Sequence, residues 1–147
     1  CRLGRSRSYN LQMRRWAVQC IACLAIASGV MSAHHSLSGA YDTSREITVE
    51  GVVTAFQFIN PHPFVTISIE ARGGDKQQWR LEMDNRSELV DIGMNSGTLK
   101  PGDRVVVTGS PGHSNAKTVY IRRLDRPLDG LRYEQVGTSP RIQIPSR

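Results

Sequence analysis

The chain has 147 residues, with 19 lysines and arginines, 13 acidic residues and three cysteines. Five of the arginines, all three cysteines and no acidic residue lie in residues 1–33, so residues 34–147 carry 14 basic and 13 acidic side chains. This near-neutral, cysteine-free region excludes a disulfide framework, gives no reason to expect a nucleic-acid partner, and suits one small domain.

The first predicted element is a secretory signal peptide that ends near residue 33. A basic Arg14-Arg15 pair follows Met13, an apolar run extends over residues 16–30, and small residues close the segment. This succession of a basic, an apolar and a small-residue region is typical of a cleaved leader. Met13 is therefore the expected start, and residues 1–12 are expected to be upstream sequence.

The alternative to a cleaved leader is an uncleaved membrane anchor. The apolar run is interrupted by Gln19, and it falls short of the roughly 18–20 apolar residues that a membrane-spanning helix needs. We therefore expect a mature protein that begins between Ser32 and His35 and is periplasmic or secreted. Its expected contact with a membrane is through the signal peptide before cleavage.

Three strands are predicted between residues 46 and 83. In the first, over residues 46–58, the apolar side chains change phase around Gly51, which favours a β-bulge at that glycine. A Gly-containing hairpin turn over residues 72–75 separates the second strand from the third. The apolar members of the alternation in these two strands are expected to point inward: Val65, Ile67, Ile69, Trp79, Leu81 and Met83.

A short helix and two further strands complete the predicted domain. Asn85 with Glu88 three residues later resembles a capping box, and Gly93 suits a helix C-terminus, so a helix is expected from about Asn85 to Ile92. A turn over residues 100–103 precedes a strand around residues 105–108. A loop over residues 110–116 precedes the last strand, around residues 119–122.

Three strands, one short helix and two strands form the order of a five-stranded OB-type Greek-key barrel. The competing folds are another small β-barrel or a β-sandwich, but a sandwich usually needs about seven strands. We predict an all-β, OB-like domain over residues 34–136, with Leu89, Val90 and Ile92 covering one end of the barrel. Residues 137–147 are expected to be a disordered tail.

Several short motifs follow one another along residues 34–130. They are His34-His35-Ser36, Tyr41-Asp42, Gly51 with Val53, Asn60-Pro61-His62, Trp79 with Glu82, and Leu99-Lys100-Pro101-Gly102-Asp103. With these residues the chain resembles a family of small exported bacterial proteins, a domain of unknown function (number 6152). The resemblance implies a secreted, β-rich domain and no particular activity. The family commonly continues Asn-Pro-His with a small residue and an aromatic one, whereas Pro63 and Phe64 stand here.

The segment Asn60-Pro61-His62-Pro63 holds a histidine between two prolines. Each proline fixes its own φ, and Pro63 also restricts His62, so the imidazole is confined to few directions. In an OB-type barrel the loops between strands 1 and 2 and between strands 4 and 5 flank the ligand face, and His62 and His113 fall in these loops. The competing interpretation is a turn begun by Asn60-Pro61, in which His62 packs or hydrogen-bonds.

The predicted ligand-binding residues combine the two loop histidines with residues of the family pattern. They are Asn60, His62, Trp79, Glu82 and His113.

A metal site is the alternative function for the histidines. If the leader is cleaved after Ala33, the α-amine and imidazole of His34 suit Cu(II), with His62 as a third ligand. If cleavage falls one residue earlier, His35 becomes the third residue, which is another copper-binding arrangement. The expected metal ligands are therefore His34, His35 and His62, and copper is the one cofactor that the sequence suggests.

The remaining polar residues offer no catalytic pattern. Ser36 and Ser38 show no base–orienter arrangement, and the acidic residues Glu82, Asp84 and Glu88 are expected to form a solvated face and a helix cap. A solvated strand face rather than a nucleic-acid surface is expected for Arg122, Arg123, Arg126 and Arg132 with Tyr120 and Tyr133.

The predicted function is an exported, non-enzymatic binding or accessory protein. Its partner is expected to be a small ligand or another exported protein, without nucleic acid. A periplasmic copper-binding protein is the alternative.

Overall fold

The computed structural model describes residues 37–144, except residues 72, 116 and 138. Residues 38–147 belong to the larger of two units of the chain. The elements of the larger unit are β1 (Ile47–Gln57), β2 (Phe64–Glu70), β3 (Lys76–Glu82), α3 (Arg86–Asp91), β4 (Arg104–Pro111), β5 (Thr118–Arg126), β6 (Leu131–Val136) and β7 (Ser139–Gln143). A helical turn also covers residues 37–40. None of the helices described is both long and apolar enough to cross a membrane.

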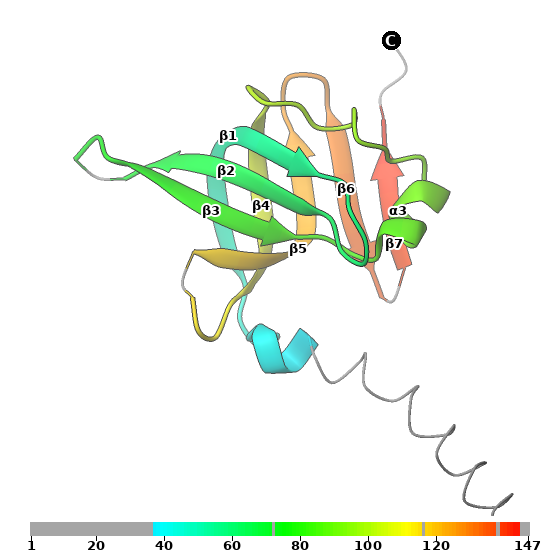
Figure 1. The fold of residues 1–147 in the computed structure, drawn as a ribbon, viewed down its shortest axis with the longest axis horizontal. Helices are drawn as coiled ribbons and strands as arrows, with labels where there is room; N and C mark the ends of the chain where they lie inside the picture. The colour runs from blue at the N-terminus through cyan, green and yellow to red at the C-terminus, as the bar shows by residue number, and fades with distance from the viewer. Residues whose placement is uncertain (1–36, 72, 116, 138, 145–147) are drawn as a thin grey trace, which may run out of the picture. The chain divides into compact units, whose positions relative to one another are not determined.

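Strands β1 to β5 close into a barrel (Figure 1). β1 pairs in antiparallel fashion with β2 and β4, β2 pairs with β3, and β4 pairs with β5. The barrel closes where β3 and β5 pair in parallel, from Arg80 opposite Thr118 to Glu82 opposite Tyr120. The predicted OB-like barrel, with a helix between its third and fourth strands, is therefore confirmed.

The bulge in β1 lies three residues later than predicted. The register with β2 shifts between Val53 and Ala55, and this shift brings Phe56 opposite the buried Val65. Gly51 serves a different purpose, because a Cβ at that position would lie 2.7 Å from the backbone oxygen of Ser68. A glycine inside a strand fits either a bulge or a close backbone approach, and here it permits the close approach of β2.

The predicted alternation of β2 and β3 is largely confirmed. Val65, Ile67, Leu81 and Met83 are fully buried in the barrel core. Ile69 and Trp79 are only partly buried against it, and the tip of the β2–β3 hairpin extends away from the barrel (Figure 1). The register is thus the predicted one, and burial decreases toward the tip of the hairpin.

Truncating Ile67 to alanine is expected to lower the free energy of unfolding by about 2–5 kcal/mol, because the side chain is fully buried and leaves a cavity. Equilibrium urea unfolding measures this change. Ser68→Ala is the matched control, since its side chain lies on the opposite face of the same strand. A loss of only a few tenths of a kcal/mol for Ile67→Ala would contradict the register of β2.

Helix α3 begins and ends as the sequence predicts. The Asn85 side chain accepts the backbone N–H of Ser87, and Gly93 follows the helix with a φ of 92°. Leu89 is fully buried and Ile92 packs against the core. The prediction for Val90 is wrong, because this side chain is 46% exposed. A helix of six residues turns one narrow stripe inward, and Val90 points about 100° away from Leu89 around the helix axis.

The Leu-Lys-Pro-Gly-Asp motif forms the turn that leads into β4 and is hydrogen-bonded to β1. The N–H of Gly102 donates to the Val53 carbonyl, and the N–H of Val53 donates to the Asp103 carbonyl. Gly102 has a φ of 96°, which favours glycine. The Asp103 carboxylate accepts from the Lys100 backbone and, at 2.6 Å, from Arg126. The motif is therefore part of the barrel scaffold.

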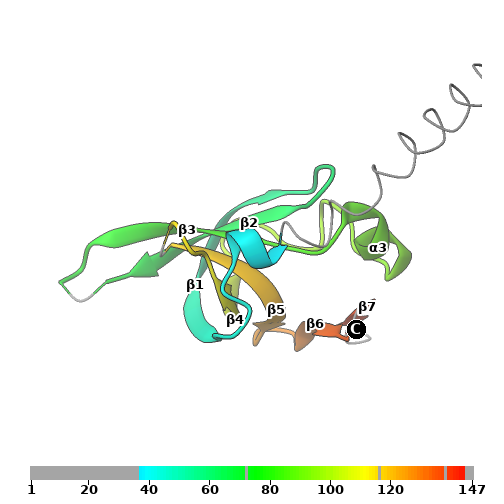
Figure 2. The same cartoon turned by 90° about the horizontal axis from the view of Figure 1, so that it is seen from below.

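The expected disordered tail is wrong for residues 139–143. These residues form β7, which pairs with β6 in a hairpin that extends the sheet beyond β5, on the side of α3 (Figure 2). The connecting loop begins at Gly137, whose φ is 64°. Few apolar residues mark this segment, but Pro140 is buried and Ile142 packs on the core opposite Tyr133. Burial of these two side chains and pairing with β6 therefore order a segment whose composition alone predicted disorder.

Candidate functional site

The loop between β1 and β2 is bonded to the segment that connects β3 to α3. The Pro61 carbonyl accepts the N–H of Arg86 at 2.9 Å, and the Pro63 carbonyl accepts the N–H of Met83 at 3.0 Å. The Asn60–Pro61 peptide is cis. The histidine between the two prolines is thus held by backbone bonds to a neighbouring segment, in addition to the restriction that the prolines impose.

The imidazole of His62 has one ring nitrogen inside the fold. Its Nδ1 lies 3.2 Å from the backbone oxygen of Met83. A carbonyl oxygen only accepts hydrogen bonds, so Nδ1 carries the hydrogen and the neutral ring has its acceptor at Nε2. The side chain is 39% exposed. The structure therefore combines features of both interpretations, a turn-packing hydrogen bond and a partly exposed ring.

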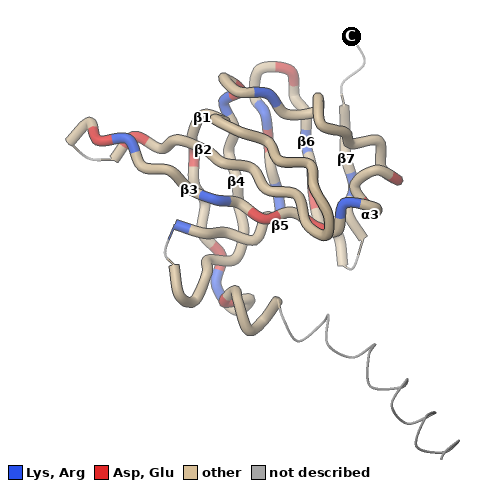
Figure 3. Tube along the Cα trace, viewed as in Figure 1, with Lys and Arg blue, Asp and Glu red and all other residues tan. Residues whose placement is uncertain are grey.

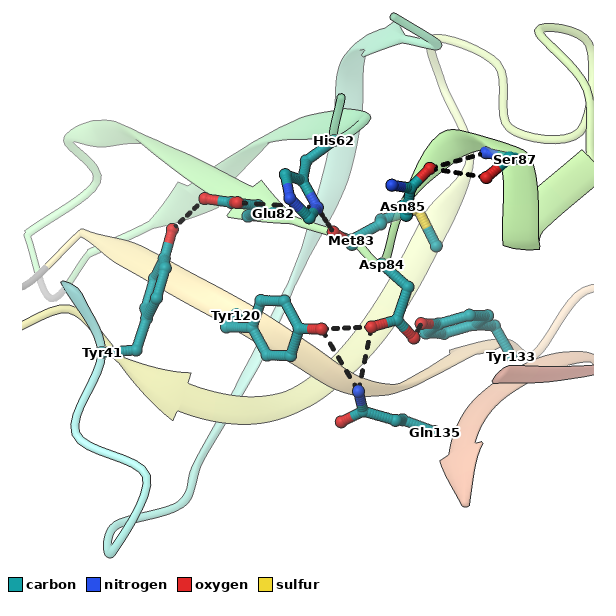
Figure 4. Close-up of polar contacts among 10 residues, drawn as sticks. All are labelled: Tyr41, His62, Glu82, Met83, Asp84, Asn85, Ser87, Tyr120, Tyr133 and Gln135. Atoms are coloured by element: carbon teal, nitrogen blue, oxygen red, sulfur yellow. Dashed lines mark hydrogen bonds and ion pairs between the residues drawn. The ribbon is translucent and has the colours of Figure 1, made fainter. Parts of the chain in front are cut away.

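Glu82 connects His62 to Tyr41 (Figure 4). One carboxylate oxygen accepts the Tyr41 hydroxyl at 2.6 Å, and the other lies 3.9 Å from Nδ1 of His62. Burial raises the pKa of Tyr41, and the hydrogen bond to the carboxylate raises it further, so the phenol stays protonated as a donor. We call Tyr41, His62 and Glu82 the rim cluster.

An aromatic ring and a guanidinium lie beside the rim cluster on the outer face of β2 and β3. Phe64 stands directly opposite Glu82 in the β2–β3 pairing. Arg80, two residues before Glu82 on the same face, places its guanidinium carbon 3.6 Å from the centre of the Phe64 ring. Tyr41 reaches this face because its backbone pairs with Gly112 at the end of β4.

A buried carboxylate follows Glu82 by two residues (Figure 4). Asp84 accepts the hydroxyls of Tyr120 and, at 2.6 Å, Tyr133, as well as the Gln135 amide at 2.9 Å. Burial is the main cause that raises the pKa of both tyrosines, and the neighbouring Asp84 charge adds to it. We call these four residues the Asp84 cluster, which ties β5 and β6 to the end of β3.

The expectation of a solvated Asp84 is therefore wrong, because only 5% of the residue is exposed. Its partners come from strands far along the chain, and no local pattern marks them. Tyr41, His62 and Glu82 all belong to the family pattern, which is the one sequence signal that included every member of the rim cluster.

Among the described residues, the other predicted ligand-binding residues form no hydrogen bond or ion pair with the rim cluster. Asn60 is exposed in the loop. Trp79 faces the core, and its indole Nε1 is buried without a hydrogen-bond partner among the described residues. His113 is exposed, and its Nε2 lies 3.1 Å from the Ser38 carbonyl. The structure thus brings together His62 and Glu82, while Trp79 and His113 make other contacts.

The expected metal ligands His34 and His35 lie outside the described residues. Within the part of the chain that is described, no group of three His, Cys, Asp or Glu side chains is arranged to hold a metal ion.

Carboxylates hold three of the four arginines of β5 and β6, and the fourth, Arg122, donates to the Ser110 hydroxyl. Arg123 and Arg132 both pair with Asp125 at 2.7 Å, and Arg126 pairs with Asp103 and Asp129. Basic and acidic positions are interleaved along the strands (Figure 3).

Comparisons with known proteins identify a family, and they do not indicate a particular activity. No curated protein matches the chain. A solved structure titled "Crystal structure of tRNA fluorescent labeling enzyme" is similar at 17% identity and a TM-score of 0.38, over 70% of this chain and 29% of that one. The chain therefore spans less than a third of that protein. A model described as a family of unknown function (DUF6152) matches residues 20–120. The chain belongs to this family.

Proposed function

We propose that the chain is an exported, non-enzymatic binding protein whose ligand contacts the rim cluster. The observation that carries the proposal is the partly exposed His62 ring, whose Nδ1 is bonded to Met83 and whose Nε2 is left as an acceptor. Glu82 stands beside it and is oriented by Tyr41. Side chains that are fixed before binding lose less conformational entropy when a ligand arrives.

The contacts of the histidines support binding rather than catalysis. The rings of His62 and His113 both bond to backbone carbonyls. A nucleophilic mechanism needs a hydroxyl or thiol within reach of a base. Ser110, which is fully buried, is instead bonded to the Arg122 guanidinium.

Export rests on the leader pattern of residues 13–33, which lies outside the described residues. A small ligand or another exported protein is the proposed partner, and the periplasm or the extracellular medium is the proposed location.

Copper binding is the second candidate function, and one observation favours it. Histidines that bind metals commonly donate their second ring N–H to a carbonyl or carboxylate, which fixes the tautomer, and His62 Nδ1 meets the Met83 carbonyl in this way. His34 and His35 would supply the other ligands.

His62→Ala is expected to abolish ligand binding and to change stability little. The ring is partly exposed, so losing its hydrogen bond should cost only about 0.5–1.5 kcal/mol. Binding is measured by ligand-observed NMR with mixtures of small polar molecules, and with Cu(II) on protein whose N-terminal residue has been identified by mass spectrometry.

The matched control is His113→Ala, because this exposed histidine also bonds to a carbonyl. Hits that bind wild type and His113→Ala but not His62→Ala support the proposal. Cu(II) binding that needs His62 and also His34 and His35 selects the copper candidate. Unchanged binding by His62→Ala, or no bound molecule at all, rules out the rim cluster as the ligand site.

A further inference from the structure

Two opposite charges flank the ring of Phe64 on the outer face of the barrel. Resting on the proposed function, we infer that the ligand of the rim cluster is a small zwitterion, with a carboxylate that binds Arg80 and an ammonium group that binds Glu82. The inference names the chemical class of the ligand, which the rim cluster alone leaves open.

We call the side chains of Arg80 and Glu82 the two arms of the proposed site. Arg80 has the properties of a side chain that binds a carboxylate. Its guanidinium carbon lies 3.6 Å over the centre of the Phe64 ring, and this contact limits the motion of the exposed side chain. It forms no ion pair with any described residue, whereas Arg104, Arg123, Arg126 and Arg132 each pair with a carboxylate. The planar guanidinium binds carboxylates through two parallel hydrogen bonds. An exposed, pre-positioned arginine of this kind suits an anionic group of the ligand.

Glu82 supplies the complementary arm. The Tyr41 hydroxyl occupies one of its oxygens, and the other is 3.9 Å from His62 Nδ1, which is too long for a hydrogen bond. That oxygen therefore keeps acceptor capacity. The side chain is 20% exposed, so its attraction to a cation is screened less than at an open surface. An ammonium group, with three donors and no acceptor, matches it.

The spacing of the two arms fits a molecule of amino-acid size. Residues 80 and 82 are two positions apart on one strand, so their Cα atoms are separated by roughly 6.7 Å. Phe64 lies opposite Glu82, and its ring supports the Arg80 guanidinium. A simple anion or a simple cation engages one arm only, whereas a zwitterion engages both.

The test compares a zwitterion with its two halves. Glycine and 4-aminobutyrate serve as zwitterions of two lengths, and acetate and methylamine serve as half-ligands. Dissociation constants are measured by amide chemical-shift titration of wild type, Arg80→Gln and Glu82→Gln. Arg104→Gln is the control, because it removes the same charge from an arginine already paired with Glu50.

We expect at least one zwitterion to bind roughly tenfold or more tightly than either half-ligand, since each charged hydrogen-bonded arm contributes separately. Arg80→Gln should remove the acetate response and leave that of methylamine, Glu82→Gln should do the reverse, and Arg104→Gln should change neither. Zwitterion binding that is insensitive to Arg80, or the absence of any zwitterion response, overturns the inference. His62-dependent binding of other molecules in the NMR mixtures would then still support the proposed function, so the two failures are distinct.

Discussion

Asp84→Ala is expected to lower the free energy of unfolding by about 3–5 kcal/mol. The substitution leaves the hydroxyls of Tyr120 and Tyr133 and the Gln135 amide without their shared acceptor in a buried location. Each buried polar group that loses its partner costs about 1–3 kcal/mol, partly offset because the carboxylate itself is no longer desolvated. Guanidinium chloride unfolding at neutral pH measures the change.

Tyr133→Phe is the matched control for this prediction, because it removes one donor and keeps the ring. We expect it to cost about 1 kcal/mol, and the double variant should show a coupling energy, since both changes remove the same bond. If Asp84→Ala costs less than Tyr133→Phe, the carboxylate is solvated and the Asp84 cluster does not hold β6 to the barrel.

Gly109→Ala is expected to destabilise the fold by roughly 3 kcal/mol or more, the upper end of the cost of overpacking. A Cβ at this position would overlap the backbone oxygen of Tyr120 and crowd Val119. The obstacle is the β5 backbone at the register shift between β4 and β5, so no side-chain rotation relieves it. Equilibrium unfolding monitored by circular dichroism measures the loss.

Two other glycines give the scale for this result. Gly51→Ala would approach the Ser68 oxygen to 2.7 Å, and Gly39→Ala would meet no atom within 4 Å. The expected order of destabilisation is therefore Gly109, then Gly51, then Gly39 near zero. Equal effects at Gly109 and Gly39 would show that β4 and β5 separate without cost, which contradicts their close packing.

The barrel was predictable because local sequence patterns identify most of its strands and its helix. Alternating apolar residues identified β2 and β3, and Asn85 and Gly93 identified both ends of α3. The role of Gly51 was not predictable, because a β-bulge and a close backbone approach both appear in a sequence as a glycine within a strand. The difference lies in Ser68 on the partner strand.

The site was predictable only in part. The two prolines drew attention to His62, but its hydrogen bond to Met83 depends on where β3 ends relative to the loop. The Asp84 cluster joins residues 36 to 51 positions apart. Such contacts arise from barrel topology, and neither spacing nor composition reports them.

The parallel pairing of β3 with β5 has a consequence for how the protein fluctuates. It joins residues 38 positions apart, Arg80 with Thr118, through three residue pairs. Parallel pairing is slightly less stable per residue than antiparallel pairing, and the seam has three residue pairs against six between β1 and β4. The seam is therefore expected to open before the antiparallel pairs. Arg80 and Glu82 lie on the seam. Glu82 is oriented by Tyr41, which pairs with the end of β4, so a ligand that binds the closed barrel more tightly would slow hydrogen exchange of the seam amides.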